Sequence, residues 1–265
     1  MKQISDLREI QLRLLDILTD IDRYCRDKGL RYSIAYGTLL GAVRHKGFIP
    51  WDDDIDIAMP RPDFEKFIAD YGRDGSTPYR CLYDVRTDEE YFVQYFAKVH
   101  DPRTISCEAR MPRYRFGLNI DVFPVDGKPE EDQARFEKEC CSLVHRIYLR
   151  QRPFFPWSWH DPLIPKIEAH MHSLDWWMDK CVSRMKSHPF ESSRFRGAVS
   201  TRPNGTREVF PREMFDSFRD IEFEGRTVMC VAEAEGWLTQ VFGPDYMTPP
   251  PSHLRKTHNL TVTVK

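Results

Sequence analysis

Carboxylates and β-branched residues alternate in the segment Asp52–Met59, which otherwise has the composition of a buried β-strand. Side chains of a strand point alternately to its two faces, so Ile55, Ile57 and Met59 can face a core while Asp54 and Asp56 point together to the other side. Two carboxylates in one small space repel each other, which raises the pKa of one of them and costs stability unless a cation neutralises them. Oxygen ligands of this kind suit Mg²⁺ or Mn²⁺. The segment therefore predicts a divalent metal site on a strand. The alternative, a solvated acidic loop, would not require the intervening isoleucines.

A small-residue turn precedes this strand. Gly37 and Thr38 follow the apolar stretch Tyr32–Tyr36, which we expect to be a strand, and a short helix should then cover Leu39–Arg44. Such a turn lets backbone N–H groups and a hydroxyl approach a phosphate closely. A Gly-Thr pair followed by Asp-x-Asp between apolar residues indicates a nucleotidyltransferase-type site, where a metal bridges carboxylates and phosphates.

A third carboxylate is expected on another strand, Leu118–Phe123. Ile120 and Val122 share one face of that strand, so Asp121 points to the opposite face and can reach the metal if the two strands are neighbours. The alternative is a surface carboxylate near a turn. Asp52 shares the face of Asp54 and is either a further ligand or a supporting group, whereas the neighbouring Asp53 should face the other way.

Cationic and aromatic residues lie near these carboxylates in the sequence. Arg44 suits bidentate phosphate binding, and His45 could donate a hydrogen bond, move a proton, or be an ordinary surface imidazole. Trp51 could stack on a base or pack its loop. Weaker substrate-binding candidates are Lys98 and His100, at the end of a predicted strand, and His258 in the tail.

The stretch from Tyr36 to Phe67, with its core Leu-Leu-Gly-Ala-Val-Arg-His-Lys-Gly-Phe-Ile-Pro-Trp-Asp-Asp-Asp-Ile-Asp, resembles the LicD phosphotransferase family, whose distant relatives include fukutin and fukutin-related protein. Residues 117–127, 223–226 and 243–251 resemble the same family. The resemblance implies transfer of phosphocholine, or a similar phospho-alcohol, from CDP-choline or a related CDP-alcohol to a sugar hydroxyl of a cell-surface glycan, with release of CMP. It also implies that Asp54, Asp56 and Asp121 are the acidic triad of the nucleotidyltransferase superfamily. Similar tails suggest that the segment bearing His258 folds back over the site.

We expect a mixed α/β, nucleotidyltransferase-like fold in one catalytic domain, residues 1–265. A small mixed sheet flanked by helices should use residues 1–128 and 197–265, with a helical, aromatic-rich insert at 129–196. The hydrophobic spacing predicts a helix within residues 4–28 that ends at Gly29, and a second helix that ends at Gly72. We further expect a strand over 91–99, a strand pair over 220–230 with Gly225 at positive φ, a helix over 232–242 and an irregular tail.

The charge balance excludes a general basic field, because 39 Lys and Arg residues stand against 41 Asp and Glu residues. Nucleic acid is therefore not an expected partner. The seven cysteines contain no Cys-x-x-Cys spacing, which favours reduced, structural thiols and argues against zinc. The sequence shows neither a signal peptide nor a membrane-length apolar run, so we expect a cytoplasmic protein. A lipid-linked glycan acceptor could bring it to the inner face of the membrane, and the aromatic segment 153–165 could touch lipid or pack internally.

Three questions of function stay open from the sequence. A quaternary ammonium substrate favours an aromatic cage, for which the candidates are Trp157, Trp159, Trp176 and Trp177, although the last two could equally be core residues of a helix. An Asp-x-Asp motif also occurs in metal-dependent glycosyltransferases that use nucleotide sugars. A non-catalytic choline- or glycan-binding module is the alternative from another class, but the short aromatic repeats expected of it are missing from the sequence.

Overall fold

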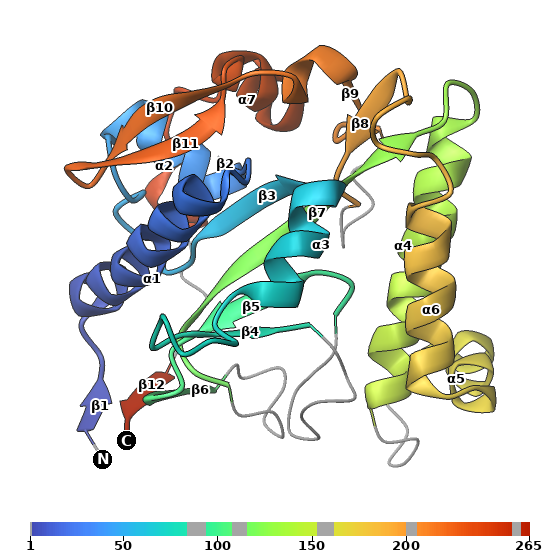
Figure 1. Cartoon of the computed structure of the whole chain (residues 1–265), viewed down its shortest axis with the longest axis horizontal. Helices are drawn as coiled ribbons and strands as arrows, with labels where there is room; N and C mark the ends of the chain where they lie inside the picture. The colour runs from blue at the N-terminus through green and yellow to red at the C-terminus, as the bar shows by residue number, and fades with distance from the viewer. Residues whose placement is uncertain (1, 84–93, 108–115, 153–161, 200–205, 256–260) are drawn as a thin grey trace. The chain divides into compact units, whose positions relative to one another are not determined.

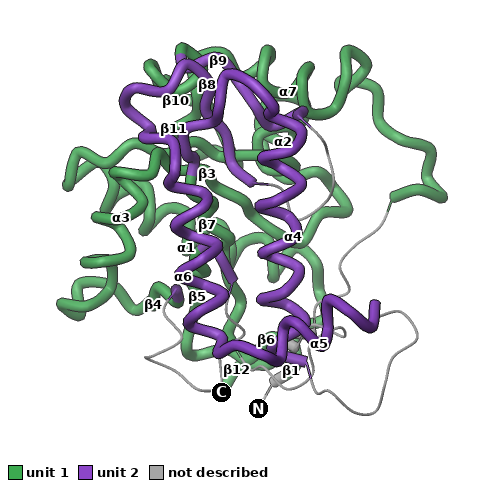
Figure 2. Tube along the Cα trace, turned by 90° about the vertical axis from the view of Figure 1, so that its right-hand side faces the viewer, with its two compact units in different colours: residues 1–82, 97–124, 213–265 green, residues 83–96, 125–212 purple. Residues whose placement is uncertain are grey.

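The computed structural model describes residues 2–83, 94–107, 116–152, 162–199, 206–255 and 261–265. The chain forms two compact units (Figure 2). Unit 1 contains residues 1–82, 97–124 and 213–265, and unit 2 contains residues 83–96 and 125–212. Unit 2 includes the whole range expected to form the helical insert. The mixed α/β architecture confirms the expected fold class (Figure 1).

The central sheet of unit 1 has the strand order β2-β3-β7-β5-β4. These strands are β2 (Ser33–Ile34), β3 (Asp56–Pro60), β4 (Arg80–Leu82), β5 (Ala97–His100) and the first half of β7 (Asn119–Lys128). The pairs β2–β3, β4–β5 and β5–β7 are antiparallel. Because β7 lies between β3 and β5, the two strands predicted to carry carboxylates are neighbours in one sheet.

Among the described residues, four α-helices belong to unit 1: α1 (Leu7–Lys28), α2 (Tyr36–His45), α3 (Arg61–Asp70) and α7 (Ala234–Phe242). The Asp6 carboxylate accepts the backbone N–H groups of Arg8 and Glu9 and so caps α1, and Gly29 ends the helix with φ +64°. This N-cap supplies partners for N–H groups that have none within the helix. The predicted end at Gly29 is confirmed, whereas α3 already ends at Asp70 with Tyr71 as its C-cap, and the predicted Gly72, with φ +74°, lies in the turn that follows.

A β-hairpin in unit 1 packs on the sheet through side-chain hydrogen bonds. It consists of β10 (Phe218–Phe223) and β11 (Arg226–Val231), and its turn places Glu224 and Gly225 at positive φ, as predicted for Gly225. The backbone N–H of Val231 donates to Ser33 Oγ over 3.0 Å, and that of Met229 donates to the hydroxyl of the buried Tyr32 over 3.2 Å. The hairpin is thereby attached to the start of the site-bearing sheet.

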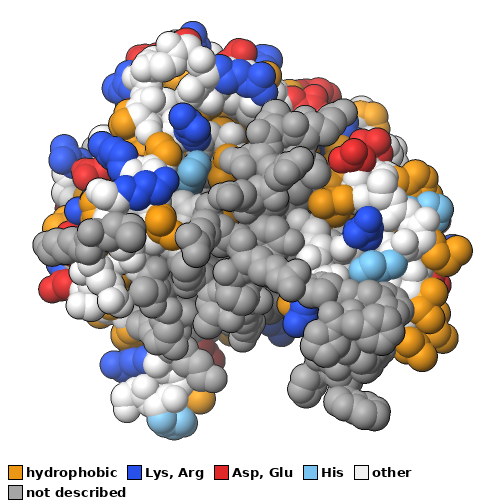
Figure 3. Space-filling model, turned by 90° about the horizontal axis from the view of Figure 1, so that it is seen from below, with side chains coloured by type: hydrophobic (Ala, Val, Ile, Leu, Met, Phe, Trp, Pro, Cys, Tyr) orange, Lys and Arg blue, Asp and Glu red, His pale blue; other side chains and the backbone are white. Residues whose placement is uncertain are grey.

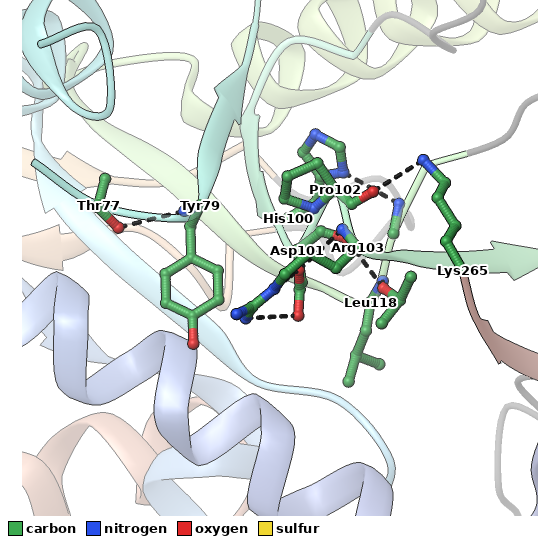
Figure 4. A network of polar contacts seen from close by, with 10 residues as sticks. Thr77, Tyr79, His100, Asp101, Pro102, Arg103, Leu118 and Lys265 are labelled. Carbon is green, nitrogen blue, oxygen red and sulfur yellow. Dashed lines mark hydrogen bonds and ion pairs between the residues drawn. The ribbon is translucent and has the colours of Figure 1, made fainter. Parts of the chain in front are cut away.

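The turn between β5 and β6 (Thr104–Cys107) is held by an Asp101 hub (Figure 4). The Asp101 carboxylate accepts hydrogen bonds from the backbone and the guanidinium of Arg103, and its own N–H donates to the carbonyl of Leu118. Burial opposes ionisation of Asp101, but the hydrogen bonds from Arg103 outweigh it and lower the pKa of Asp101. Lys265 Nζ adds a 2.8 Å hydrogen bond to the carbonyl of Pro102. The hub fixes the end of β5 relative to the start of β7.

The described part of unit 2 contains three helices and a small group of strands. The helices are α4 (Gln133–Gln151), α5 (Leu163–Met171) and α6 (Leu174–Met185), and the second half of β7 pairs with β8 (Phe195–Gly197), which pairs with β9 (Phe210–Pro211). The Lys128 ammonium, fully buried, pairs with Glu137 over 2.6 Å. This ion pair joins the end of β7 to α4.

Several predicted boundaries are wrong. The strand expected over Tyr32–Tyr36 covers only Ser33–Ile34, and Tyr36 already begins α2, so Gly37 and Thr38 lie in the first helical turn instead of a separate turn. The tail was expected to be irregular, but β12 (Thr261–Val264) pairs with both β1 (Lys2–Ile4) and β6. Of the strand expected over 91–99, residues 91–93 lie outside the described residues and the observed strand begins at Ala97. Unit 1 also includes the 3₁₀ helix η3 (Ser252–Leu254), and the 3₁₀ helix η2 (Arg212–Phe215) begins at the last residue of unit 2 and continues into unit 1.

Candidate functional site

The predicted alternation of carboxylates and apolar side chains is present in the structure. Asp53, Ile55 and Ile57 are buried, whereas Asp52, Asp54 and Asp56 are partly exposed. Asp54 lies in the segment just before β3, and Asp56 is the first residue of that strand. The acidic face of this segment is therefore accessible, and Asp53 points to the opposite side, as expected.

Asp121 lies on the neighbouring strand β7. Its backbone N–H donates to the carbonyl of Ile55 over 3.1 Å, so Asp121 sits beside the residue between Asp54 and Asp56. On its other side Asp121 is in register with Lys98 of β5. The Lys98 ammonium, with only 5% of its side chain exposed, lies 2.5 Å from Asp121 Oδ1 and 3.0 Å from Asn119 Oδ1. The predicted neighbour relation between the two strands is confirmed, and Lys98 is brought directly to the carboxylates.

The charges around Asp56 are strongly coupled. Burial, followed by repulsion from Asp54, Asp121 and Asp52, raises the pKa of Asp56 well above its usual range, and Lys98 offsets only part of this effect. A carboxyl group in these surroundings is stabilised in its charged form by a cation. The oxygen donor set of Asp54, Asp56 and Asp121 thus fits Mg²⁺ or Mn²⁺ by its chemistry.

The described residues contain no group of three His, Cys, Asp or Glu side chains already placed to hold a metal ion. Asp121 instead engages the Lys98 ammonium. The metal triad therefore stays a prediction that rests on the donor chemistry and the charge repulsion.

The start of α2 approaches the carboxylates closely. Thr38 Oγ1 accepts the backbone N–H of Asp56 over 2.9 Å, and the Asp56 carbonyl accepts the N–H of Ala35, also over 2.9 Å. A Cβ atom added to Gly37 would lie 2.8 Å from Asp52 Oδ2, so only glycine leaves room for that carboxylate. Because the N–H groups of a first helical turn have no partner within the helix, phosphate binding by Gly37 and Thr38 stays a prediction that the start of a helix can serve as well as a turn.

The far end of α2 and the tail together form a cationic group. Arg44 is half-buried, donates from Nη1 to the carbonyl of Tyr246 over 3.1 Å, and donates from Nε to His45 Nε2 over 3.0 Å. The Arg255 guanidinium lies 4.5 Å from the centroid of the Trp51 ring. Burial and the neighbouring Arg255 lower the pKa of Arg44, and burial together with Arg44 lowers that of His45.

Sequence reasoning did not identify Arg255. Arg255 lies about 200 positions from Trp51 and belongs to no motif. The sequence indicated only that the tail segment carries several cationic residues. The role of Glu224 was also missed. Its carboxylate accepts the N–H of Phe48, its own N–H donates to the Lys46 carbonyl, and it pairs with Arg8 over 2.6 Å. Glu224 thereby clamps the loop between His45 and Trp51.

Several predicted residues lie elsewhere. His258, Trp157 and Trp159 are outside the described residues. Trp176 and Trp177 belong to α6 in unit 2, where Trp177 is buried. The Lys180 ammonium lies 4.6 Å from the Trp176 ring centroid, and His172 stacks on the same ring at 3.7 Å. A choline cage at Trp176 would have to compete with these two groups.

Comparison with known proteins agrees with this geometry. The family described as LicD/FKTN/FKRP, nucleotidyltransferase domain, matches residues 29–165, a range that contains Asp54, Asp56 and Asp121. The chain belongs to this LicD family. It is 30% identical to the lipopolysaccharide cholinephosphotransferase LicD of Haemophilus influenzae over 98% of both chains. Two uncharacterized proteins, one of Rickettsia prowazekii and one of Rickettsia typhi, are each 44% identical to it over 52 residues, a fifth of this chain.

The described helices offer no membrane span, since none combines sufficient length with sufficient hydrophobicity. Four of the six cysteines whose side chains the structure describes are buried, and burial raises the pKa of Cys25, Cys81, Cys140 and Cys230. Thiols of this kind are poor nucleophiles and poor metal ligands.

Proposed function

We propose that this protein transfers phosphocholine, or a similar phospho-alcohol, from a CDP-activated donor to a sugar hydroxyl of a lipopolysaccharide-type glycan and releases CMP. The observation that carries the proposal is the convergence of Asp54 and Asp121 on Asp56 at the start of β3. The 30% identity, over 98% of both chains, to a relative named as a lipopolysaccharide cholinephosphotransferase supports the choice of the transferred group and the acceptor.

Asp54, Asp56 and Asp121 are the residues we assign to a Mg²⁺ or Mn²⁺ ion. When bound, such an ion supplies charge neutralisation for the donor diphosphate and for the leaving group. The carboxylates also balance the positive charge of Lys98, which is buried beside Asp121.

The protein's own cations and backbone dipoles would hold the donor. Arg44 offers a planar, bidentate guanidinium for phosphate oxygens, and the N–H groups of Gly37 and Thr38 at the start of α2 favour negative charge. Trp51 and His45 lie at the Arg44 end of the same helix and loop, where Trp51 can present its ring to the cytosine base and His45 can donate a hydrogen bond.

Activation of the acceptor asks little of a base, because the phosphoryl transition state is loose. Asp121 or Asp56 can accept a hydrogen bond from the attacking hydroxyl and orient it in line with the leaving CMP.

A lipid-linked glycan acceptor would bring the protein to the anionic cytoplasmic surface of a membrane, and unit 2 carries a surface suited to that contact. In unit 2, α5 exposes a stripe made of Leu163 (54% exposed), Ile164 (69%), Ile167 (44%) and Met171 (70%). Met171 also lines a groove of about 1020 Å³ whose lining is net cationic, with five cationic side chains, among them Lys138 and Lys180, against the two carboxylates of Glu139 and Glu168. Hydrophobic side chains gather on the side of the molecule where α5 lies (Figure 3). An apolar stripe that continues into cationic residues matches the chemistry of an anionic bilayer.

Turnover with a panel of donors tests the proposal. CDP-choline, CDP-ethanolamine, CDP-ribitol and a UDP-sugar are each incubated with deacylated lipopolysaccharide and Mg²⁺, and released nucleotide is quantified. We expect CMP from a CDP-alcohol, and a loss of roughly a hundredfold or more in Asp54→Asn. Asp27→Asn, an exposed carboxylate of α1, is the matched control and should keep full activity.

Two outcomes would contradict the proposal. Release of UDP with no CMP would identify a nucleotide-sugar glycosyltransferase. Binding of choline or glycan by a folded protein that releases no nucleotide would identify a non-catalytic binding module.

A further inference from the structure

Two partly exposed aromatic rings pack edge to face beside the carboxylates of unit 1. The centroids of Tyr36 and Phe123 are 5.5 Å apart, and the ring planes meet at 86°. Behind Tyr36 lies the buried Trp237, at 6.2 Å and 80°, which in turn contacts Phe215 at 5.7 Å. The two outer rings are therefore held in place by a buried aromatic layer.

Both rings are tied to the candidate site through the backbone. Tyr36 is the first residue of α2 and directly precedes Gly37 and Thr38, whose hydroxyl accepts the Asp56 N–H. Phe123 lies two positions after Asp121 on β7, so both side chains project from the same face of the strand, about 7 Å apart along it. That spacing can be covered by the two-carbon linker between a phosphate ester and an alkylammonium group.

The backbone of Tyr36 is strained. Its φ of +46° is uncommon for any residue other than glycine and costs on the order of 1 kcal/mol or more. Strain of this kind persists where the surrounding structure determines the side-chain position, and here it directs an aromatic ring toward Phe123 at the start of α2.

A quaternary ammonium group has no N–H to donate, so proteins recognise it through the electron-rich faces of aromatic rings and nearby negative charge. Two rings that meet at nearly a right angle form two walls of such a site.

We propose that Tyr36 and Phe123 form the subsite for the quaternary ammonium of the transferred phospho-alcohol. This inference rests on the proposed function, because it assigns the alcohol end of the donor whose phosphate lies at the carboxylates. It predicts that the enzyme selects a trimethylammonium over a primary ammonium and over a neutral group of the same shape.

The test compares CDP-choline with the CDP ester of 3,3-dimethylbutanol, in which a carbon atom replaces the charged nitrogen. The measured quantity is the ratio of kcat/KM for the two donors. Phe123→Leu and Tyr36→Leu should each lower this ratio by about five- to tenfold, the effect expected when one cation–π contact of a partly desolvated site is lost. Tyr36→Phe and Phe123→Tyr keep an aromatic face and should preserve the ratio, which separates ring electrostatics from packing.

Phe242→Leu is the matched control, because Phe242 is an aromatic residue of α7 with 45% exposure, and it should leave the ratio unchanged. An unchanged ratio in both leucine variants would overturn the subsite while the transfer reaction stands, as would a wild-type preference for CDP-ribitol over CDP-choline. Failure of the wild type to release CMP from any CDP ester would overturn the proposed function and the subsite together. The two failures are thus distinguishable.

Discussion

At the scale of single residues, the lack of a side chain at Gly37 is the close approach that directly involves a carboxylate of the acidic cluster. An added Cβ would meet Asp52 Oδ2 at 2.8 Å. Asp52 is one of the groups that raise the pKa of Asp56, so a displaced Asp52 alters the charge at the centre of the site.

We therefore expect Gly37→Ala to lower kcat/KM for the CDP donor by roughly tenfold. The free energy of unfolding should change little, because alanine stabilises a helix by about 1 kcal/mol relative to glycine, which offsets the cost of displacing Asp52. Steady-state kinetics and urea unfolding measure the two effects separately. Gly236→Ala in α7, where the new Cβ meets side chains no closer than 3.7 Å, is the control and should leave activity unchanged. Equal kinetics in the two variants would show that Asp52 does not depend on this close approach.

The positions of single residues were predictable where they depend on the geometry of one strand alone. The alternation of Asp54 and Asp56 with Ile55 and Ile57 follows from the two-residue period of a strand and needs no knowledge of the rest of the chain. Arg255 could not be found in this way, because its position over Trp51 depends on the path of the tail.

At the scale of elements, the turn between β5 and β6 shows how a polar hub sets the position of a strand. Asp101 has 7% of its side chain exposed and binds both the backbone and the guanidinium of Arg103. A carboxyl with a lowered pKa contributes stability that is present above its unfolded pKa and is lost as the pH falls through its folded pKa.

Asp101→Asn should accordingly lower the free energy of unfolding by about 2 kcal/mol at pH 7. The difference from wild type should begin to shrink as the pH falls below about 4, the pKa of an unfolded aspartate, and should disappear as the pH falls through the lower pKa of the folded carboxyl. Urea unfolding at a series of pH values measures this difference. Asp27→Asn, whose carboxylate is 66% exposed and 3.9 Å from Arg23, provides the comparison and should change little. A constant difference at all pH values would rule out ionisation of Asp101 as the cause.

The exposed stripe of α5 gives a second element-scale prediction. Ile167→Asp should reduce co-sedimentation with vesicles that contain anionic lipid, because it places a carboxylate in an apolar stripe next to cationic residues. Leu12→Asp on α1 is closely matched, since Leu12 is 45% exposed and Ile167 is 44% exposed, and it should bind vesicles like the wild type. The stripe would instead be a contact between copies of this chain if the wild type binds no vesicles but self-associates, and Ile167→Asp abolishes that self-association.

Element types were more predictable than their boundaries. The long amphipathic helix that ends at Gly29 and the hairpin with Gly225 carry strong local signals. The stretch Tyr32–Tyr36 has the composition of a strand, but Tyr36 starts a helix, where its ring packs against Phe123 and Trp237. Those contacts link residues far apart in the chain, which local propensity does not register.

At the scale of the whole molecule, the acidic cluster depends on strand order. Asp56 and Asp121 are more than sixty positions apart in the chain and meet because β7 lies between β3 and β5. The sequence could state only that Asp121 reaches Asp56 if their strands are neighbours, since periodicity gives the face of each strand but not its partner. The family resemblance implied that the two residues belong to one site, and the sheet order confirms that their strands are neighbours.

The central claim is that this cluster holds a divalent cation that in turn holds a cytidine diphosphate donor. Calorimetric titration of CDP-choline into the wild type and into Asp56→Asn, each with Mg²⁺ and with EDTA, measures it directly. We predict binding by the wild type in Mg²⁺, and loss of that binding both in EDTA and in Asp56→Asn, while Asp27→Asn behaves as the wild type. Equal binding of CDP-choline with and without Mg²⁺, or undiminished binding by Asp56→Asn, would contradict the account.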